Sequence, residues 1–82
     1  MSLGHTKDEK FVIKLYEMVT KAGDPDLAIS RYEVGNALGL QKRGVDTTCV
    51  LLAQANFIKK AGDVDIRLTK HGENLALRLL EE

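Results

Sequence analysis

What the sequence lacks excludes several classes of protein. Its one cysteine, Cys49, has no partner for an intramolecular disulfide or a cysteine-based zinc site, and it favours a reducing, cytoplasmic location. The four aromatic residues are too few for a surface that stacks several exposed rings on single-stranded nucleic acid. No apolar run approaches the length of a membrane span, and the N-terminus has no hydrophobic signal core.

Catalytic and metal-binding groups are also missing. The acidic residues are spread along the expected helix surfaces, and no nucleophile–base constellation or phosphate-cradling loop is visible. His5 and His71 have no other metal-ligating residues near them at the spacing of a metal site. We therefore expect a protein that is not an enzyme and that carries no cofactor and no metal.

The charges balance overall but not along the chain. The 82 residues include 12 basic and 12 acidic ones, so the formal net charge is zero. Residues 29–71 hold seven basic and four acidic residues, which makes the centre of the chain positive and its flanks negative. That sign suits an anionic partner, although nonspecific nucleic-acid binders are usually basic overall. The length fits one domain, expected over residues 6–82, with residues 1–5 as a disordered N-terminus or a tag remnant.

The first helix is expected over residues 7–22. Thr6 and Glu9 have the spacing of a capping box, apolar residues then recur at helical spacing, and Gly23 supplies a left-handed stop. The apolar stripe is too wide for one buried face, because Val12 and its neighbours extend it. Either this helix is buried on two sides within one chain, or it forms part of a dimer interface.

Two more helices are expected after a short apolar strand at residues 27–29. Ser30 and Glu33 again have capping-box spacing, and they open a helix that ends at Gly39. The next helix begins at residue 41 or 42 and fades at residue 56. Its buried stripe is expected to contain Val45, Cys49, Leu52 and Ala53, and its opposite face Arg43, Asp46, Thr47, Val50 and Gln54.

A change to a period of two then indicates a β-hairpin. A three-residue turn at residues 61–63 would pair Ile58 with Ile66. It would also place Lys59 opposite Asp65, so that apolar residues share one face and an ion pair lies on the other. A two-residue turn would instead oppose an isoleucine to an aspartate, so we prefer the first register.

A last helix is expected after its cap, Thr69, and Gly72 in its first turn should let another backbone approach. The order is helix, short strand, helix, helix, strand, strand, helix. This order and two stretches, EVGNALGL and NFIKKAGDVDIRLTKHGENLALRLL, resemble the winged helix-turn-helix superfamily. The second stretch is similar to a wing, a Leu-Thr-x-x-Gly motif and a leucine-rich helix of small bacterial and archaeal transcriptional regulators. These include regulators of the multiple-antibiotic-resistance and phenolic-acid-response kinds.

The resemblance implies a fold and a function. The fold is mainly α with a small β-hairpin (α+β), a winged helix-turn-helix. The function is sequence-specific binding of double-stranded DNA by a small transcriptional regulator, with the helix after Gly39 in the major groove and the wing on the backbone. The alternative is a winged-helix module that docks proteins without binding DNA, which the zero net charge and the outward Val50 favour. A homodimer through the first and last helices is also expected, because both carry excess apolar residues.

The expected DNA-binding residues follow from the same resemblance and from their charge. A helix N-terminus offers free amides to phosphate, and an arginine there can bond a guanine edge in two places. Asp46 lies among these positions, where it repels phosphate unless it accepts a bond from a cytosine amine. The DNA-binding set is Arg31, Gln41, Lys42, Arg43, Thr47, Lys59, Lys60 and Arg67.

Overall fold

The central helix of the computed structural model, which describes residues 5–81, is α1 (Lys7–Lys21). Thr6 and Glu9 form the expected capping box: the Thr6 N–H donates to Glu9 Oε1 at 2.8 Å, and the Glu9 N–H donates to Thr6 Oγ1 at 3.1 Å. Gly23 adopts the expected left-handed conformation, with φ of 78°. Apart from His5, the residues expected to be disordered or a tag remnant lie outside the described range.

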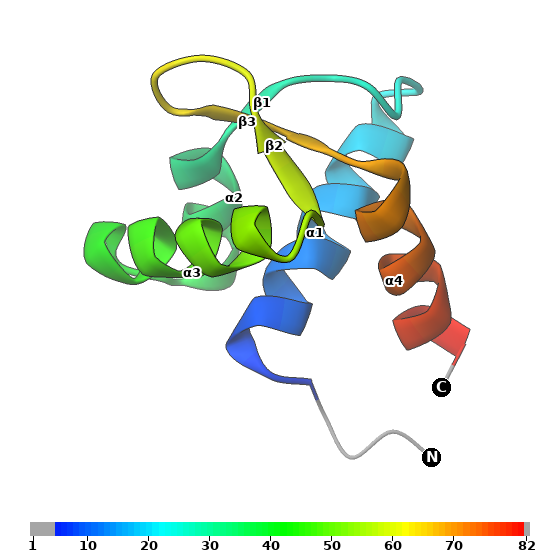
Figure 1. Ribbon diagram of the computed structural model, residues 1–82, viewed down its shortest axis with the longest axis horizontal. Helices are drawn as coiled ribbons and strands as arrows, with labels where there is room; N and C mark the ends of the chain where they lie inside the picture. The colour runs from blue at the N-terminus through cyan, green and yellow to red at the C-terminus, as the bar shows by residue number, and fades with distance from the viewer. Residues whose placement is uncertain (1–4, 82) are drawn as a thin grey trace.

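Burial of α1 on two sides explains its wide apolar stripe. It packs against α2 (Arg31–Leu38) and α3 (Lys42–Gln54) as well as against α4 (Lys70–Glu81). Figure 1 shows α1 between these elements, with α4 on the side away from α3. Phe11, Val12, Leu15 and Val19 are all fully buried. The first of the two alternatives is therefore confirmed, and the width of the stripe requires no second chain.

The turn between α2 and α3 depends on two glycines. Gly39 ends α2 with φ of 73°, as expected, and the Leu40 N–H donates to the carbonyl of Gly35 at 2.9 Å. A Cβ on Gly35 would overlap the Val45 side chain, so α2 and α3 cross where α2 has no side chain. Ser30 caps α2 through a bond from the Tyr32 N–H at 3.3 Å.

The buried stripe of α3 differs from the expected one by two residues. Val45, Cys49 and Leu52 are buried, as expected. Ala53 is exposed, and Thr48, 2% exposed, takes a place in the core. Thr48 lies three residues after Val45 and four before Leu52, so at 3.6 residues per turn it falls on the same face of the helix as both and is buried although its side chain is polar.

Three short strands form an antiparallel sheet in the order β1-β3-β2. They are β1 (Ile29–Ser30), β2 (Ile58–Lys60) and β3 (Asp65–Leu68). β1 pairs with β3 through Ile29 and Ile66. The sheet covers one end of α1, and the loop between β2 and β3 projects away from the helices as the wing (Figure 1).

The register of the hairpin differs from the expected one by two residues. Ile58 lies opposite Leu68, and Lys59 lies opposite Arg67. The expected pairing of Lys59 with Asp65 is therefore wrong. A shift of two keeps every side chain on its expected face, so the apolar face is still the buried one. The cross-strand neighbour of Lys59 is a second cation and not an acid.

The start of α4 fits closely against the base of this hairpin. Thr69 Oγ1 accepts from the Gly72 N–H at 3.0 Å, and the Thr69 N–H donates to the carbonyl of Phe57 at 3.2 Å. A Cβ on Gly72 would overlap the same carbonyl oxygen, which confirms the expected close approach of another backbone. No helix within residues 5–81 is both long enough and apolar enough to cross a membrane.

Candidate nucleic-acid interface

The N-terminus of α3 has no capping side chain and no acidic residue. Its N-cap residue, Gln41, makes no side-chain capping bond, and its first turn contains no Asp or Glu. By contrast, Thr6, Ser30 and Thr69 cap the other three helices of the described chain, and each of those helices has an acid in its first turn. The positive end of the helix dipole of α3 is therefore left without an anionic partner from its own turn.

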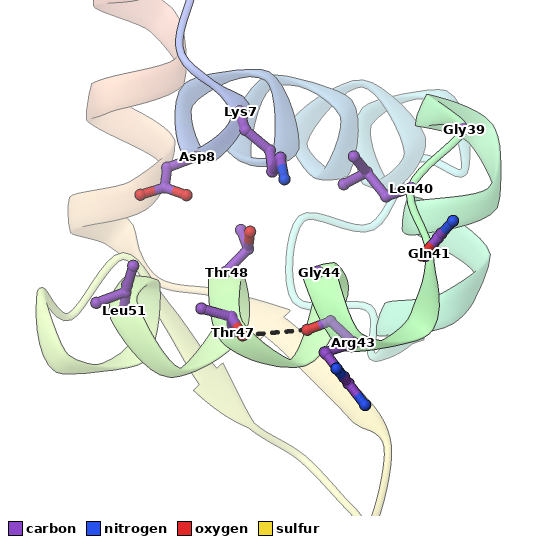
Figure 2. A pocket seen from close by; sticks show the side chains of 10 residues that line it. All are labelled: Lys7, Asp8, Gly39, Leu40, Gln41, Arg43, Gly44, Thr47, Thr48 and Leu51. Carbon is purple, nitrogen blue, oxygen red and sulfur yellow. Dashed lines mark hydrogen bonds between the residues drawn. The ribbon is translucent and has the colours of Figure 1, made fainter.

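Four of the expected DNA-binding residues lie together at this end. Gln41, Lys42, Arg43 and Thr47 are all exposed. The Thr47 hydroxyl donates to the carbonyl of Arg43 at 3.1 Å, which leaves its oxygen free to accept a bond. Figure 2 shows Arg43 pointing away from α1. These four side chains are therefore exposed at one end of α3, and we call the surface that they form the α3 surface.

A groove of about 580 Å³ separates the start of α1 from α3. Lys7 extends across it toward α3 (Figure 2), and its Nζ lies 3.8 Å from the point where Gly44 would carry a Cβ. Lys7 was not identified from the sequence, because Lys7 and Gly44 are far apart along the chain and become neighbours only when α1 packs on α3. Lys7 therefore adds a cation beside the α3 surface.

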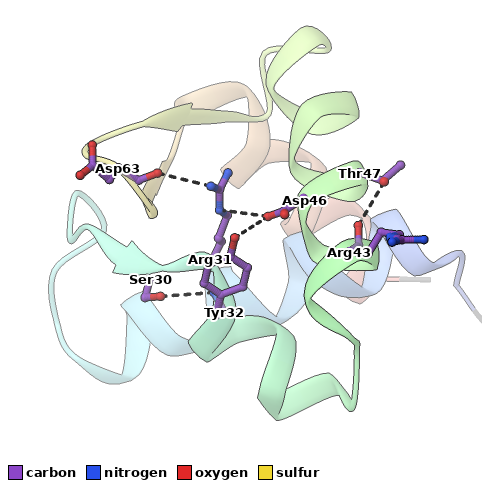
Figure 3. A network of polar contacts seen from close by, with 7 residues as sticks. All are labelled: Ser30, Arg31, Tyr32, Arg43, Asp46, Thr47 and Asp63. Atoms are coloured by element: carbon purple, nitrogen blue, oxygen red, sulfur yellow. Dashed lines mark hydrogen bonds and ion pairs between the residues drawn. The ribbon is translucent and has the colours of Figure 1, made fainter.

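Arg31 does not lie on this surface. Its Nε is 3.5 Å from Asp46 Oδ1, and its Nη2 donates to the carbonyl of Asp63 at 3.3 Å. The Arg31 side chain is only 18% exposed, against 46% for Asp46. Figure 3 shows it between α3 and the wing. Of the expected set, Arg31 is the residue whose charged group is bound within the chain.

Asp46 has a second partner that the sequence analysis did not identify. The Tyr32 hydroxyl donates to Asp46 Oδ1 at 2.6 Å (Figure 3). This bond, together with desolvation, raises the pKa of Tyr32 above its usual value, because the proton is held between the phenol and the carboxylate. Asp46 is thus engaged by Tyr32 and Arg31, so its negative charge is partly compensated where α3 would approach phosphate.

The three basic residues of the wing lie on two faces of the hairpin. Lys59 and Arg67 are opposite one another on the outer face. Lys60 is opposite Ile66 on the other face, where it lines a groove of about 260 Å³ beside Val50 and Gln54 of α3. Lys59 and Lys60 are exposed, and Arg67 is half-buried. Like charges directly opposite one another destabilise a sheet, so the pairing of Lys59 with Arg67 lowers the stability of the hairpin.

Other candidate chemistry is weak in the described residues. Cys49 is 4% exposed, and burial raises the pKa of its thiol to about 11, which keeps it protonated. No group of three or more His, Cys, Asp or Glu within residues 5–81 is arranged to hold a metal ion. Large apolar side chains are exposed at Val50 and Leu51 on α3 and at Leu77 and Leu80 on α4.

Comparisons with known structures identify the fold. A MarR family protein from Mycobacterium tuberculosis matches with a TM-score of 0.67 and 23% identity, over 96% of this chain and 54% of that one. The PcaV transcriptional regulator from Streptomyces coelicolor, solved with its natural ligand, matches with a TM-score of 0.68 and 21% identity, over 98% and 56% of the two chains. A MarR family regulator from Neisseria meningitidis matches with a TM-score of 0.63 and 23% identity, over 88% and 51%.

These likenesses confirm the expected winged helix-turn-helix fold and its order of elements. The chain spans about half the length of each matching structure. No protein-family model matches the sequence, and no curated protein matches it either.

Proposed function

We propose that this protein is a DNA-binding transcriptional regulator that reads double-stranded DNA with α3 in the major groove. The observation that carries this proposal is the exposed start of α3, which has free amides, no acid in its first turn, and Lys42 and Arg43 beside them. Such a helix end attracts phosphate through its amides and its dipole. The likeness in fold to transcriptional regulators supports the same role. This function also places the protein inside the cell.

Each residue of the α3 surface has a role that its chemistry suits. Arg43 bonds a guanine edge, and Thr47 meets a thymine methyl group or a phosphate. Gln41 and Lys42 bind phosphates at the helix start, and Lys7 binds a phosphate across the groove from them. Lys59, Lys60 and Arg67 bind the DNA backbone from the wing. Arg31 binds no DNA directly.

We propose further that the regulator is a homodimer. Leu77 and Leu80 are 40% and 48% exposed on the outer side of α4, where they supply apolar surface for a second copy. A twofold dimer would present two copies of α3 to half-sites roughly 34 Å apart on one face of the duplex. Light scattering after chromatography tests this: a mass of two chains supports the dimer, and a single-chain mass at high concentration excludes it. Leu80→Glu should shift a dimer toward the monomer.

Selection from a random-sequence duplex library tests the DNA-binding proposal. The protein should enrich one sequence motif, and Arg43→Ala should weaken binding to it by about 1–3 kcal/mol and relax the preference at one position. Lys7→Ala should weaken binding to all duplex sequences by a similar factor. It should also reduce the slope of the logarithm of affinity against the logarithm of salt concentration by about 0.9. Lys21→Ala, at the far end of α1, is the matched control and should change neither. Absence of duplex binding even at low salt would reject the proposal.

A protein-docking module is the second candidate, and one observation favours it. Val50 and Leu51 are 55% and 49% exposed on α3, which is more apolar surface than phosphate binding needs. Val50→Asp separates the two functions. If α3 enters the major groove, this change should weaken DNA binding through repulsion of phosphate. If α3 docks a protein, DNA binding is absent in the parent protein and the change has nothing to weaken.

A further inference from the structure

Arg31 holds the wing through both its backbone and its side chain. It is the first residue of α2, and its N–H donates to the carbonyl of Val64 at 3.0 Å. Its Nη2 donates to the carbonyl of Asp63 at 3.3 Å. Both acceptors belong to the connection between β2 and β3, so one residue binds two adjacent carbonyls of the wing.

The same side chain also reaches α3. Arg31 Nε lies 3.5 Å from Asp46 Oδ1, the oxygen that accepts the 2.6 Å bond from the Tyr32 hydroxyl. The guanidinium carbon is 5.3 Å from the centre of the Tyr32 ring, and the Lys42 ammonium is at the same distance from that ring. Arg31 therefore contacts the wing, α3 and its own helix at once (Figure 3).

The geometry requires an arginine. A planar guanidinium presents donors in two directions, so it can face the wing carbonyl and the Asp46 carboxylate together. An ammonium group at the end of a lysine is a single point and serves one of these partners well at most. Arg31 Nε is buried and has no hydrogen bond within the described chain, so the Asp46 carboxylate at 3.5 Å is the nearest group that offsets its charge.

We propose that Arg31 is a positioning residue that fixes the wing relative to α3, with Asp46 as its anchor on α3. The inference rests on the proposed DNA binding, because it concerns how the two DNA-binding elements are spaced. The wing tip, residues 61–64, lies beyond the paired strands and is exposed. Without the Arg31 side chain, the strands stay paired and the backbone bond to Val64 remains, but the tip loses its contact at Asp63 and its link to α3. The distance between the wing tip and the α3 surface, and so the way both approach one duplex, is then no longer fixed.

A double-mutant cycle on DNA affinity tests the proposal. Arg31→Met and Asp46→Asn should each weaken binding to the selected duplex about threefold to thirtyfold, and the double variant should be no weaker than the weaker single variant. If instead Arg31 bound phosphate and Asp46 repelled it, Asp46→Asn would tighten binding and the two effects would add. That result would overturn the proposal.

The conservative variant Arg31→Lys gives a second readout that general destabilisation does not mimic. It keeps the positive charge, so a residue that merely contacts phosphate would lose little affinity. A positioning residue loses its two-directional contact, and Arg31→Lys should weaken binding as much as Arg31→Met does. Affinity close to that of the parent protein for Arg31→Lys would contradict the proposed role. Far-UV circular dichroism checks that each variant is folded.

Hydrogen exchange in the free protein separates this inference from the proposed function. In Arg31→Met, the amides of Ala61 and Asp65 should exchange faster, while those of α1 and α4 keep their protection. This measurement needs no DNA, so it holds even if the protein binds none. Unchanged exchange at the wing would show that Arg31 does not fix it. If the wing amides of Arg31→Met exchange faster but the parent protein binds no DNA, Arg31 does fix the wing, and the proposed DNA-binding function is rejected.

Discussion

The pair of cations on the outer face of the wing predicts opposite effects of one mutation on stability and on DNA binding. Lys59 and Arg67 are directly opposite in the observed register. Opposite residues in an antiparallel pair have Cβ atoms about 5 Å apart, so we take about 6 Å between the charges. In water this repulsion is about 0.7 kcal/mol, and screening at physiological salt reduces it to about 0.3 kcal/mol.

Lys59→Glu converts this repulsion into an attraction of similar size. The free energy of unfolding should therefore rise by about 0.6 kcal/mol at physiological salt and by about 1 kcal/mol at an ionic strength of about 0.01 M. For a domain of this size, the first value corresponds to a rise in Tm of about 2–5 °C. Binding to duplex DNA should weaken by about tenfold, because a phosphate contact becomes a repulsion.

Thermal unfolding at both ionic strengths and fluorescence anisotropy with duplex DNA measure the two effects. The double variant Lys59→Glu/Arg67→Glu is the control, because it again places like charges opposite one another. Its stability should return to within about 0.3 kcal/mol of the parent protein, while its DNA binding should be the weakest of the three. β2 is an edge strand, and glutamate keeps a charge there, which limits edge-to-edge association. A fall in stability for Lys59→Glu would refute the reasoning.

Three further predictions concern the fold. Gly72→Ala should destabilise the protein by about 2–3 kcal/mol in urea unfolding, because its Cβ would overlap the Phe57 carbonyl; an unchanged midpoint would contradict this close approach. Cys49 should react with a thiol reagent at pH 8 only as fast as the protein opens, because burial raises the pKa of its thiol to about 11; rapid labelling of the folded protein would argue against this burial. The pKa of Glu9 is held below its ordinary value of 4.5, mainly by the bond from the Thr6 N–H, so its stabilising contribution is present above that pH and is lost as the pH falls through the lowered value. A carboxyl titration by NMR should show this midpoint, and Thr6→Pro, which lacks the N–H, should raise it.

The sequence predicted most of the fold because its signals are local. The capping box of Thr6, the left-handed Gly39 and the close approach at Gly72 each follow from a few neighbouring residues, and the structure confirms them. The order of elements follows from the change of apolar period and is also confirmed. The signals for these features can be found without knowing which segments meet in space, although the sequence does not identify Phe57 as the residue whose backbone approaches Gly72.

The register of the hairpin depended on contacts that the sequence does not show. An apolar pattern with a period of two fixes which face is buried, but it does not distinguish registers that differ by two residues. The expected register rested on a turn length and on an ion pair of Lys59 with an acid. The observed one brings Ile58 opposite Leu68, next to the bond from the Thr69 N–H to the Phe57 carbonyl. In the observed register, the base of the hairpin is therefore also hydrogen-bonded to the residue that caps α4.

The candidate site was predicted in part for a similar reason. The start of α3 is one continuous segment, so its exposed side chains could be grouped from the sequence. Arg31 could not be placed, because its partners Asp46 and Asp63 lie 15 and 32 residues away along the chain and come from two other elements. Lys7 reaches the groove only through the packing of α1 on α3.

An NMR shift map during titration with duplex DNA tests the central claim most directly. The labelled protein is mixed at low salt with the duplex enriched by selection, or with a random duplex if none is enriched. The account predicts that the largest shifts occur at residues 41–47 and at Lys59, Lys60 and Arg67, while the outer side of α4 stays unchanged. Unchanged chemical shifts at residues 41–47 while the protein remains folded, or changes confined to another surface, would contradict the claim that α3 binds duplex DNA.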